Sequence, residues 1–401
     1  MRVNTGGILA PQDVVGRDAF IESLWRTLER QGIVLVAERR MGKTSILIKM
    51  KAEPPPDTLV LMSDVEGASR VAEFIELLLR EIGRHLGTAT KVATWFDKLK
   101  QDLGGTEVGG WVKLPAAAAQ SWKAHLARLL GDLATNHPQR LVLVWDELPW
   151  MLQKVAAAEG PAMVVDLLDV LRSQRQKHRN LRMVYTGSIG LHHVARGLHE
   201  GGPVGAPLND LRTIEVPPLD REHAAGLALS LLHGEGLQMD EPEAVAAAIA
   251  GAVEGIPYFV QHIVAGLADR RQRVTRERVE QQVAEALTDP QDPWNLEHYR
   301  QRMGEYYGAQ AGLARAVLNQ LAEFDSLTLG ELHERLRVSF QGNTEADRKS
   351  LEGDREPLRS LLKRLQRDHY LRQEASGAYA FRFAILRRWW RLDLDMDRDM
   401  E

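Results

Sequence analysis

The chain has 401 residues, 44% of them hydrophobic, and its 51 Lys and Arg against 55 Asp and Glu give a formal net charge of −4. This balance excludes a global attraction to nucleic acid, so any such binding would need a local basic patch. The absence of cysteine excludes disulfides, Cys-ligated zinc, iron–sulfur clusters and thiol catalysis. No apolar run approaches the roughly 20 residues that span a bilayer, and residues 1–6 lack signal-peptide architecture. We therefore expect a soluble, cytoplasmic protein without membrane contact.

Segments typical of strands and helices alternate through residues 1–217. The expected strands cover residues 33–37, 58–63, 141–145 and 181–185, and the expected helices begin at Lys43 or cover 71–86 and 163–177. Such alternation predicts an α/β domain with a parallel sheet and crossover helices. A glycine-dense stretch at 104–110 predicts an exposed loop or short hairpin.

The first expected strand leads into Ala37-Glu-Arg-Arg-Met-Gly-Lys-Thr44, a close match to G-x-x-x-x-G-K-[ST] in which Ala37 replaces the first glycine. A tight loop before a helix directs successive backbone N–H groups at an anion, Lys43 would reach terminal phosphates, and Thr44 would ligate Mg²⁺. Because alanine disfavours positive φ, the loop must avoid that conformation at Ala37. A basic turn that caps a helix is the alternative. The nucleotide-binding candidates here are Ala37, Glu38, Arg39, Arg40, Met41, Gly42, Lys43, Thr44 and Ser45.

A second motif helps to choose between these alternatives. Residues 141–145 are apolar and end on Asp146 and Glu147, the pattern of a buried parallel strand with two acids at its carboxyl end. Ligands of open α/β sheets bind at that end. We expect Asp146 to hold Mg²⁺ with Thr44, and Glu147 to polarise the attacking water. An Asp-Glu helix cap is the other interpretation.

Residues 218–290 change to consecutive helical segments near 222–232, 241–253, 258–270 and 276–287, which predict a small helical domain. The segment Asp240-Glu-Pro-Glu243 fits a helix start with an Asp cap. Residues 291–401 predict helices at 311–323, 328–336 and 356–369, then a hairpin around Ser376-Gly377 and an acidic tail. Three helices followed by a hairpin is the pattern of a winged helix.

A local basic excess lies in this last region, where residues 355–391 carry ten Arg and Lys against three Asp and Glu. The candidate DNA contacts are Arg359, Lys363, Arg364, Arg367 and Arg382. Positions 359, 363 and 367 share one helix face by i, i+4 spacing, so they suit a phosphate backbone. A merely solvated charged face is the alternative.

With these motifs in place, the chain resembles the AAA+-related STAND and archaeal-type P-loop ATPases, relatives of the origin-recognition ATPases. That resemblance implies an ATPase core (1–217), a helical lid (218–290) and a C-terminal winged helix (291–401), with ATP and Mg²⁺ as ligands. Val14-Val-Gly-Arg-Asp18 looks like the family's V-G-R-[DE] segment, which places Val15, Gly16 and Arg17 over the adenine. Thr186-Gly-Ser-Ile-Gly190 resembles its sensor-1 turn, in which Ser188 would sense the γ-phosphate.

Two further positions follow from the resemblance. Arg212 stands where relatives can carry an arginine that completes a neighbouring subunit's site in a homo-oligomer; a salt-bridged arginine at a strand start is the alternative. Gly255-Ile-Pro257 looks like the G-x-P of STAND lids, in which Pro257 touches nucleotide, although a helix-breaking turn would have the same sequence. Ala37 and the lack of a sensor-2 arginine in the lid depart from the family pattern.

We expect a Mg²⁺-dependent ATPase in which the nucleotide state sets the angles between core, lid and winged helix. A nucleotide-gated DNA-binding regulator with little turnover is the second hypothesis. The third is a protein-interaction adaptor, for which an aromatic set would form the interface: Trp294, Tyr306, Tyr307, Trp389 and Trp390. The same aromatics would otherwise belong to a domain core.

Overall fold

The structure is a computed structural model that describes residues 1–86, 106–108, 111–113, 121–137, 139–187, 191, 194, 207–340, 351 and 354–394. The chain forms two compact units. The core unit is Leu9–Val216, and the C-terminal unit joins Met1–Ile8 to Pro217–Glu401. No described helix is long and apolar enough to cross a membrane. The further division of the C-terminal unit at residue 290 stays a prediction.

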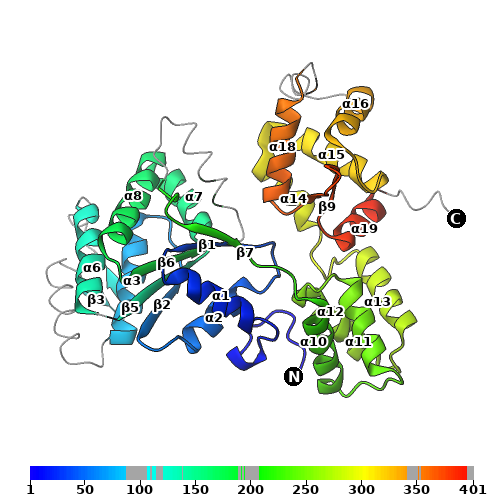
Figure 1. Cartoon of the computed structure of the whole chain (residues 1–401), viewed down its shortest axis with the longest axis horizontal. Helices are drawn as coiled ribbons and strands as arrows, with labels where there is room; N and C mark the ends of the chain where they lie inside the picture. Colours follow the sequence, from blue (N-terminus) through cyan, green and yellow to red (C-terminus); the bar gives the residue numbers. More distant parts are fainter. Residues whose placement is uncertain are drawn as a thin grey trace. The chain divides into compact units, whose positions relative to one another are not determined.

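A parallel sheet of five strands organises the core unit (Figure 1). Its strands are β1 (Ile33–Val36), β2 (Thr58–Asp64), β5 (Arg140–Asp146), β6 (Leu181–Thr186) and β7 (Arg212–Glu215). They lie in the order β2-β5-β6-β1-β7, and each neighbouring pair is parallel. All five strands therefore end at the same edge of the sheet, where ligands of such folds bind.

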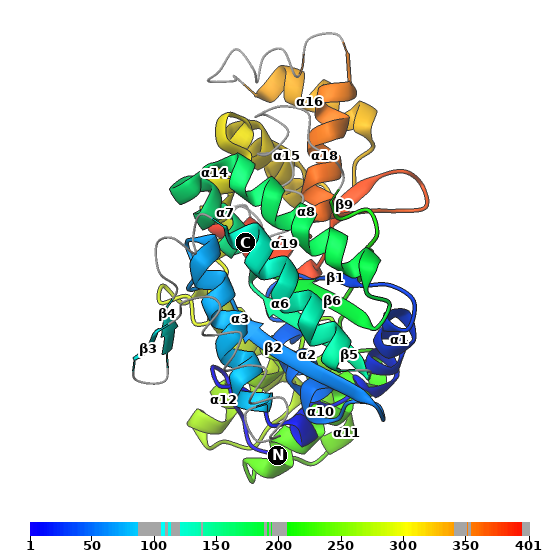
Figure 2. The same cartoon turned by 90° about the vertical axis from the view of Figure 1, so that its left-hand side faces the viewer.

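Helices cover both faces of this sheet. They are η1 (Pro11–Asp13), α1 (Asp18–Leu28), α2 (Lys43–Ala52), α3 (Val71–Leu86), α6 (Trp122–Asn136), α7 (Leu148–Glu159) and α8 (Pro161–Lys177). Figure 2 shows α3, α6 and α8 on one face, with α1 and α2 beyond the strands. Because both faces are covered, β5 is apolar and buried along nearly its whole length. An antiparallel hairpin, β3 (Thr106–Val108) and β4 (Trp111–Lys113), lies in the stretch predicted as a loop or hairpin.

A buried ion pair fixes the turn that precedes β7. Arg175, near the end of α8, donates from Nε and Nη2 to the two carboxylate oxygens of Asp210 at 2.9 and 2.8 Å. The same guanidinium donates to the carbonyl of Pro207 (2.9 Å) and to the Tyr185 hydroxyl on β6. Burial acts to raise the pKa of Asp210, but the hydrogen bond and charge of Arg175 hold it below its usual range. The pair therefore joins α8, β6 and the approach to β7.

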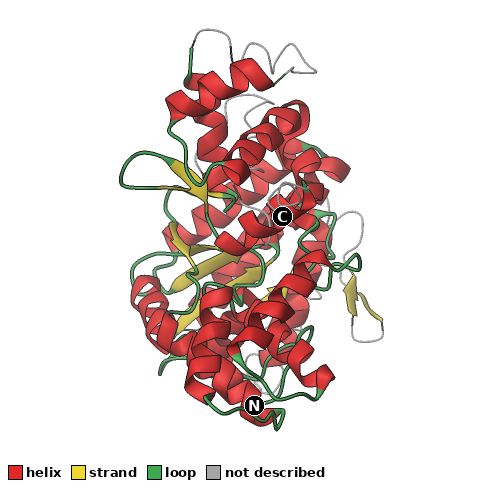
Figure 3. Cartoon of the chain, turned by 90° about the vertical axis from the view of Figure 1, so that its right-hand side faces the viewer, coloured by secondary structure: helices red, strands yellow, loops and turns green. Residues whose placement is uncertain are grey.

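Within its described residues, the C-terminal unit consists of helices and one hairpin, which Figure 3 colours red and yellow. Its elements are α10 (Arg221–Gly234), α11 (Pro242–Ala252), α12 (Pro257–Arg270), α13 (Arg276–Thr288), α14 (His298–Tyr307), η2 (Gly308–Gln310), α15 (Ala311–Glu323), α16 (Leu329–Ser339), α18 (Glu356–Arg367), β8 (Leu371–Gln373), β9 (Tyr379–Phe381) and α19 (Ala384–Asp393). Three helices and a hairpin are present where the sequence predicts them. Leu327, which precedes α16, forms an isolated antiparallel bridge with Tyr379 of β9.

The first residues of the chain pack against α10 and α12 of this unit. The backbone N–H of Val3 donates to Glu235 (2.9 Å), and that of Asn4 donates to the buried Gln261 (2.6 Å). A Cβ at Gly234 would lie 1.6 Å from the Met1 carbonyl oxygen, so the contact requires glycine there. Sequence patterns did not predict this association, because it is decided by contacts more than 230 residues apart.

Three expectations differ from the structure. Helices α6, α14 and α19 were not predicted, and α7 begins after Glu147, where a helix cap was only the alternative interpretation. The cap of α11 is Glu241 rather than Asp240, whose carboxylate instead pairs with Arg273. The proposed aromatic interface is wrong, because every member is buried: Trp294, Tyr306, Tyr307, Trp389 and Trp390. These rings form the core of the C-terminal unit, so they give no support to a protein-binding role.

Asp210→Ala should destabilise the chain by about 3–5 kcal/mol, because it leaves the buried Arg175 guanidinium without its partner. The measurement is the free energy of unfolding in urea. Asp132→Ala is the matched control, since its pair with Arg128 is exposed; it should change the free energy by less than about 1 kcal/mol. Equal effects of the two changes would contradict the structural role given to the buried pair.

Candidate nucleotide site

The loop between β1 and α2 has the shape of a phosphate cradle. Arg40 and Gly42 adopt positive φ angles of 75° and 83°, and Gly42 is the N-cap of α2. Ala37 is buried and is not among the residues with positive φ, as the sequence required. Successive turns of this kind direct backbone N–H groups toward one point at the positive end of the helix dipole.

Lys43 is the first residue of α2 and folds back over its own loop. Its Nζ donates to the Ala37 carbonyl at 2.9 Å, and the side chain is 8% exposed. Burial lowers the pKa of the Lys43 ammonium, while the negative charges of Glu38, Glu147 and Asp146 act to raise it. The ammonium therefore lies among three carboxylates in a partly desolvated place, where an additional anion would be attracted strongly.

Thr44 and Asp146 meet directly, although 102 positions separate them in the sequence. The Thr44 hydroxyl donates to Asp146 Oδ2 at 2.8 Å. Burial raises the pKa of Asp146, and the hydrogen bond from Thr44 opposes that change. Asp64 is the register partner of Asp146 on β2, so a second carboxylate stands beside it. Hydroxyl and carboxylate oxygens at one point are suitable ligands for Mg²⁺.

Glu147 stands at the junction of β5 and α7 in a left-handed conformation, with φ of 58°. A Cβ at Gly187 would lie 3.4 Å from Glu147 Oε2 and 2.6 Å from the Pro149 ring. The turn after β6 therefore passes close to the Glu147 carboxylate, and glycine at 187 permits this approach. Pro149 lies in the first turn of α7, where its missing N–H costs nothing.

Thr186, the last residue of β6, was not among the predicted site residues. It is 1% exposed, its hydroxyl has no hydrogen-bond partner within the described residues, and it pairs in register with Leu35 of β1. An unsatisfied buried hydroxyl is costly, so its place at the ligand edge marks it as a candidate ligand contact. A polar residue that ends a buried strand was the available sequence signal. The predicted sensor, Ser188, lies outside the described residues.

The segment before α1 joins the same loop. The Arg17 guanidinium is buried and donates to the carbonyl of Met41 at 3.0 Å, and Gly16 has a positive φ of 69°. Asp18 forms an ion pair with Lys49 on α2 at 2.7 Å. The predicted residues Val15, Gly16 and Arg17 are thus held next to the phosphate loop, while Arg39, Arg40 and Ser45 belong to the loop and α2.

Other predicted residues lie elsewhere. Arg212 begins β7 opposite Ile33, at the amino edge of the sheet, whereas the phosphate loop follows the carboxyl end of β1. Its side chain is exposed and has no ion-pair partner within the described part of the chain. Pro257 begins α12 in the C-terminal unit, and the basic candidates on α18, together with Arg382 after β9, belong to that unit as well.

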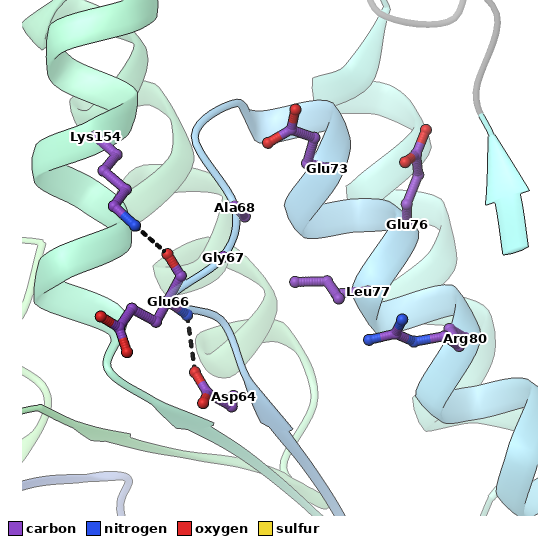
Figure 4. A pocket seen from close by; sticks show the side chains of 9 residues that line it. All are labelled: Asp64, Glu66, Gly67, Ala68, Glu73, Glu76, Leu77, Arg80 and Lys154. Carbon is purple, nitrogen blue, oxygen red and sulfur yellow. Dashed lines mark hydrogen bonds between the residues drawn. The ribbon is translucent and has the colours of Figure 1, made fainter.

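A cavity of about 650 Å³ opens beside the second carboxylate (Figure 4). It lies between the loop after β2, α3 and α7, and its walls are Asp64, Glu66, Gly67, Ala68, Glu73, Glu76, Leu77, Arg80 and Lys154. Lys154 Nζ donates to the Glu66 carbonyl at 2.7 Å, and the Glu66 N–H donates to Asp64 at 2.9 Å. Four of the lining residues are carboxylates, so the cavity is unsuited to phosphates and differs chemically from the cradle around Lys43.

No protein-family model matches the sequence, and no curated protein sequence matches it. Solved structures do resemble it. The Walker-type ATPase PABY2304 of Pyrococcus abyssi superposes with a TM-score of 0.64 at 17% identity, over 97% of this chain and 99% of that one. The ORC2 protein of Aeropyrum pernix, in ADPNP and ADP complexes, gives 0.54 at 14% identity, over 99% and 98%. The chain shares the α/β fold of these two proteins. At these identities the likeness concerns the fold alone.

The charges around Lys43 and Asp146 predict a nucleotide affinity that falls at both ends of the pH scale. Burial lowers the pKa of Lys43, so its ammonium is lost below the ordinary value of 10.5. Burial raises the pKa of Asp146, so the carboxylate that would hold Mg²⁺ is protonated at pH values still above 3.8. The measurement is the Kd of Mg²⁺-ATP across pH. Lys43→Arg should remove the alkaline limb, because arginine stays charged; its persistence would assign that limb to another group.

Proposed function

We propose that the chain is a Mg²⁺-dependent ATPase that works as a nucleotide-controlled switch. The observation that carries this proposal is the 2.8 Å hydrogen bond from Thr44 to Asp146, which brings the helix after the phosphate loop and the tip of β5 together. The AAA+ P-loop fold supports it, as does the structural likeness to the ORC2 protein of Aeropyrum pernix in its ADPNP and ADP complexes.

Each residue would have a distinct part in hydrolysis. Backbone N–H groups of the loop and the Lys43 ammonium would hold the phosphates, while Thr44 and Asp146 would hold Mg²⁺, which neutralises phosphate charge when bound. Glu147, whose carboxylate lies near the turn after β6, would orient and deprotonate the attacking water. The Thr186 hydroxyl would donate to a phosphate oxygen at the strand tip. Such positioning and electrostatics suffice for slow turnover.

The C-terminal unit contains contacts that would transmit the nucleotide state. Gly255, before Pro257, has φ of 74°, and its carbonyl accepts from the Leu219 N–H at 2.9 Å. The neighbouring Glu254 carboxylate accepts from the N–H groups of Ala384 and Ile385 at the start of α19. The turn that resembles G-x-P is therefore joined to the segment that follows the core and to the last helix. This connection supports coupling between lid and winged helix.

We also propose that Arg212 acts on a second copy of the chain. Its position at the amino edge of the sheet removes it from the phosphate loop of its own core, and its exposed guanidinium is available to a neighbour. An arginine supplied in trans accelerates phosphoryl transfer by neutralising charge. The proposed active form is thus a homo-oligomer.

Substitutions separate binding from chemistry. Lys43→Ala should weaken ATP binding by about 10- to 100-fold, because it removes a charged hydrogen-bond donor. Glu147→Gln should leave binding intact and lower kcat by about 10²- to 10⁴-fold, because it removes the general base. Titration calorimetry and phosphate release measure the two effects, with Glu66→Gln as a control for removal of a nearby exposed carboxylate. Unchanged hydrolysis by Glu147→Gln, together with ATP binding by Lys43→Ala, would show that these roles are misassigned.

A second candidate function is duplex DNA binding by the winged-helix region. Arg359, Lys363 and Arg367 are all exposed on α18, on the face opposite its buried leucines. The predicted set of DNA contacts is corrected at Arg364. Its guanidinium donates to Gln310 and to the Tyr306 carbonyl and stacks on Tyr307, so it is engaged within the unit. Arg382 is half-buried beside Phe383. Three exposed cations on one helix face therefore support this function.

Replacing Arg359, Lys363 and Arg367 together by Ala should weaken duplex binding and reduce the slope of log K against log salt by about 3, because each phosphate contact contributes about 0.9. Fluorescence anisotropy with labelled duplex across a salt series is the measurement. The matched control replaces three exposed lid arginines, Arg221, Arg273 and Arg276, which removes the same charge. If both triple variants change the slope equally, binding is non-specific attraction rather than a surface of α18.

A further inference from the structure

The phosphate loop contains an acidic side chain that the function above does not use. Glu38 follows Ala37 directly, five residues before Lys43, and is 3% exposed. A carboxylate buried inside a cradle for polyphosphate is unfavourable for that ligand, because like charges repel strongly where water is excluded. Its presence needs a physical explanation within the loop.

The geometry gives Glu38 a specific partner. Its Oε1 accepts the backbone N–H of Arg39 at 2.8 Å. Backbone N–H groups of such a loop are the donors expected to receive phosphate oxygens. The carboxylate of Glu38 therefore occupies a donor of the cradle, in the same way that a phosphate oxygen would.

The lysine is engaged by the same part of the loop. Lys43 Nζ donates to the carbonyl of Ala37, the residue before Glu38. Among the charged groups around the ammonium, Glu38 has the largest influence, and it acts to raise the pKa of Lys43. A carboxylate and a carbonyl of the loop itself thus take interactions that nucleotide phosphates could also make.

We propose that Glu38 is a built-in competitor of the nucleotide phosphates. Its carboxylate accepts from the Arg39 N–H and lies near the charge of Lys43, so a bound polyphosphate must displace it or bear its repulsion. Glu38 therefore weakens nucleotide binding and favours release, which suits a switch that must return to its empty state. This inference rests on the proposed nucleotide site and concerns how tightly that site holds its ligand.

Glu38→Gln tests the charge alone, because glutamine has the same shape and keeps an oxygen that accepts from Arg39. Titration calorimetry with Mg²⁺-ATP, Mg²⁺-ADP and adenosine is the measurement. The variant should bind ATP about tenfold more tightly, ADP by a smaller factor, and adenosine unchanged, since the repulsion depends on phosphate charge. Glu38→Ala also frees the Arg39 N–H, so its gain for ATP should equal or exceed that of Glu38→Gln.

Glu53→Gln is the matched control, because Glu53 is an exposed carboxylate at the end of the same helix, α2. It should leave all three affinities unchanged. Equal or weaker ATP binding by Glu38→Gln, beside a parent protein that binds, overturns the inference. An equal gain for adenosine also overturns it, because the effect would then be one of loop packing. If the parent protein binds no nucleotide, or binds it no more tightly than Lys43→Ala does, the proposed function is refuted instead.

Discussion

The hydrogen bond between Thr44 and Asp146 depends on a single constraint, the common direction of the five strands. Parallel pairing brings every strand end to one edge, so residues that follow β1, β5 and β6 meet although they are far apart in sequence. β6 lies between β1 and β5, and its last residue, Thr186, faces the same edge. The phosphate loop, the two acids and the strand-end hydroxyl are therefore brought together by sheet topology, and the buried apolar strands stabilise that arrangement.

The same edge concentrates charge in a place where water is partly excluded. Lys43 and Asp146 are buried, and their pKa values shift toward the neutral form of each group. Burying charged groups costs stability, and pKa shifts of this kind are typical of functional sites. Glu38 adds to this balance by supplying an internal anion.

The basic residues of α18 show that a count of charges does not reveal which charged side chains are exposed. By sequence, Arg364 is equivalent to Arg359 and Lys363, but it lies about 100° away around the helix axis and turns inward, where it stacks on Tyr307. The aromatic residues follow the same logic, since Trp390 and Trp294 are almost fully buried. A side chain's type limits what it can do, but its place on the element decides whether a partner can reach it.

The sequence alone determined the alternation of strands and helices, the phosphate loop and the acids of β5, because these depend on local periodicity and on turn chemistry within a few residues. Helix α7 begins immediately after the two acids, with Glu147 as its N-cap, so the strand end and the helix cap, which the sequence left open as alternatives, occur together. Only the tertiary structure decided that the Thr186 hydroxyl has no hydrogen-bond partner among the described residues, that Arg212 lies at the opposite edge, and that residues 1–8 pack on the C-terminal unit. These features arise from strand order and from contacts between distant segments, which no local pattern records.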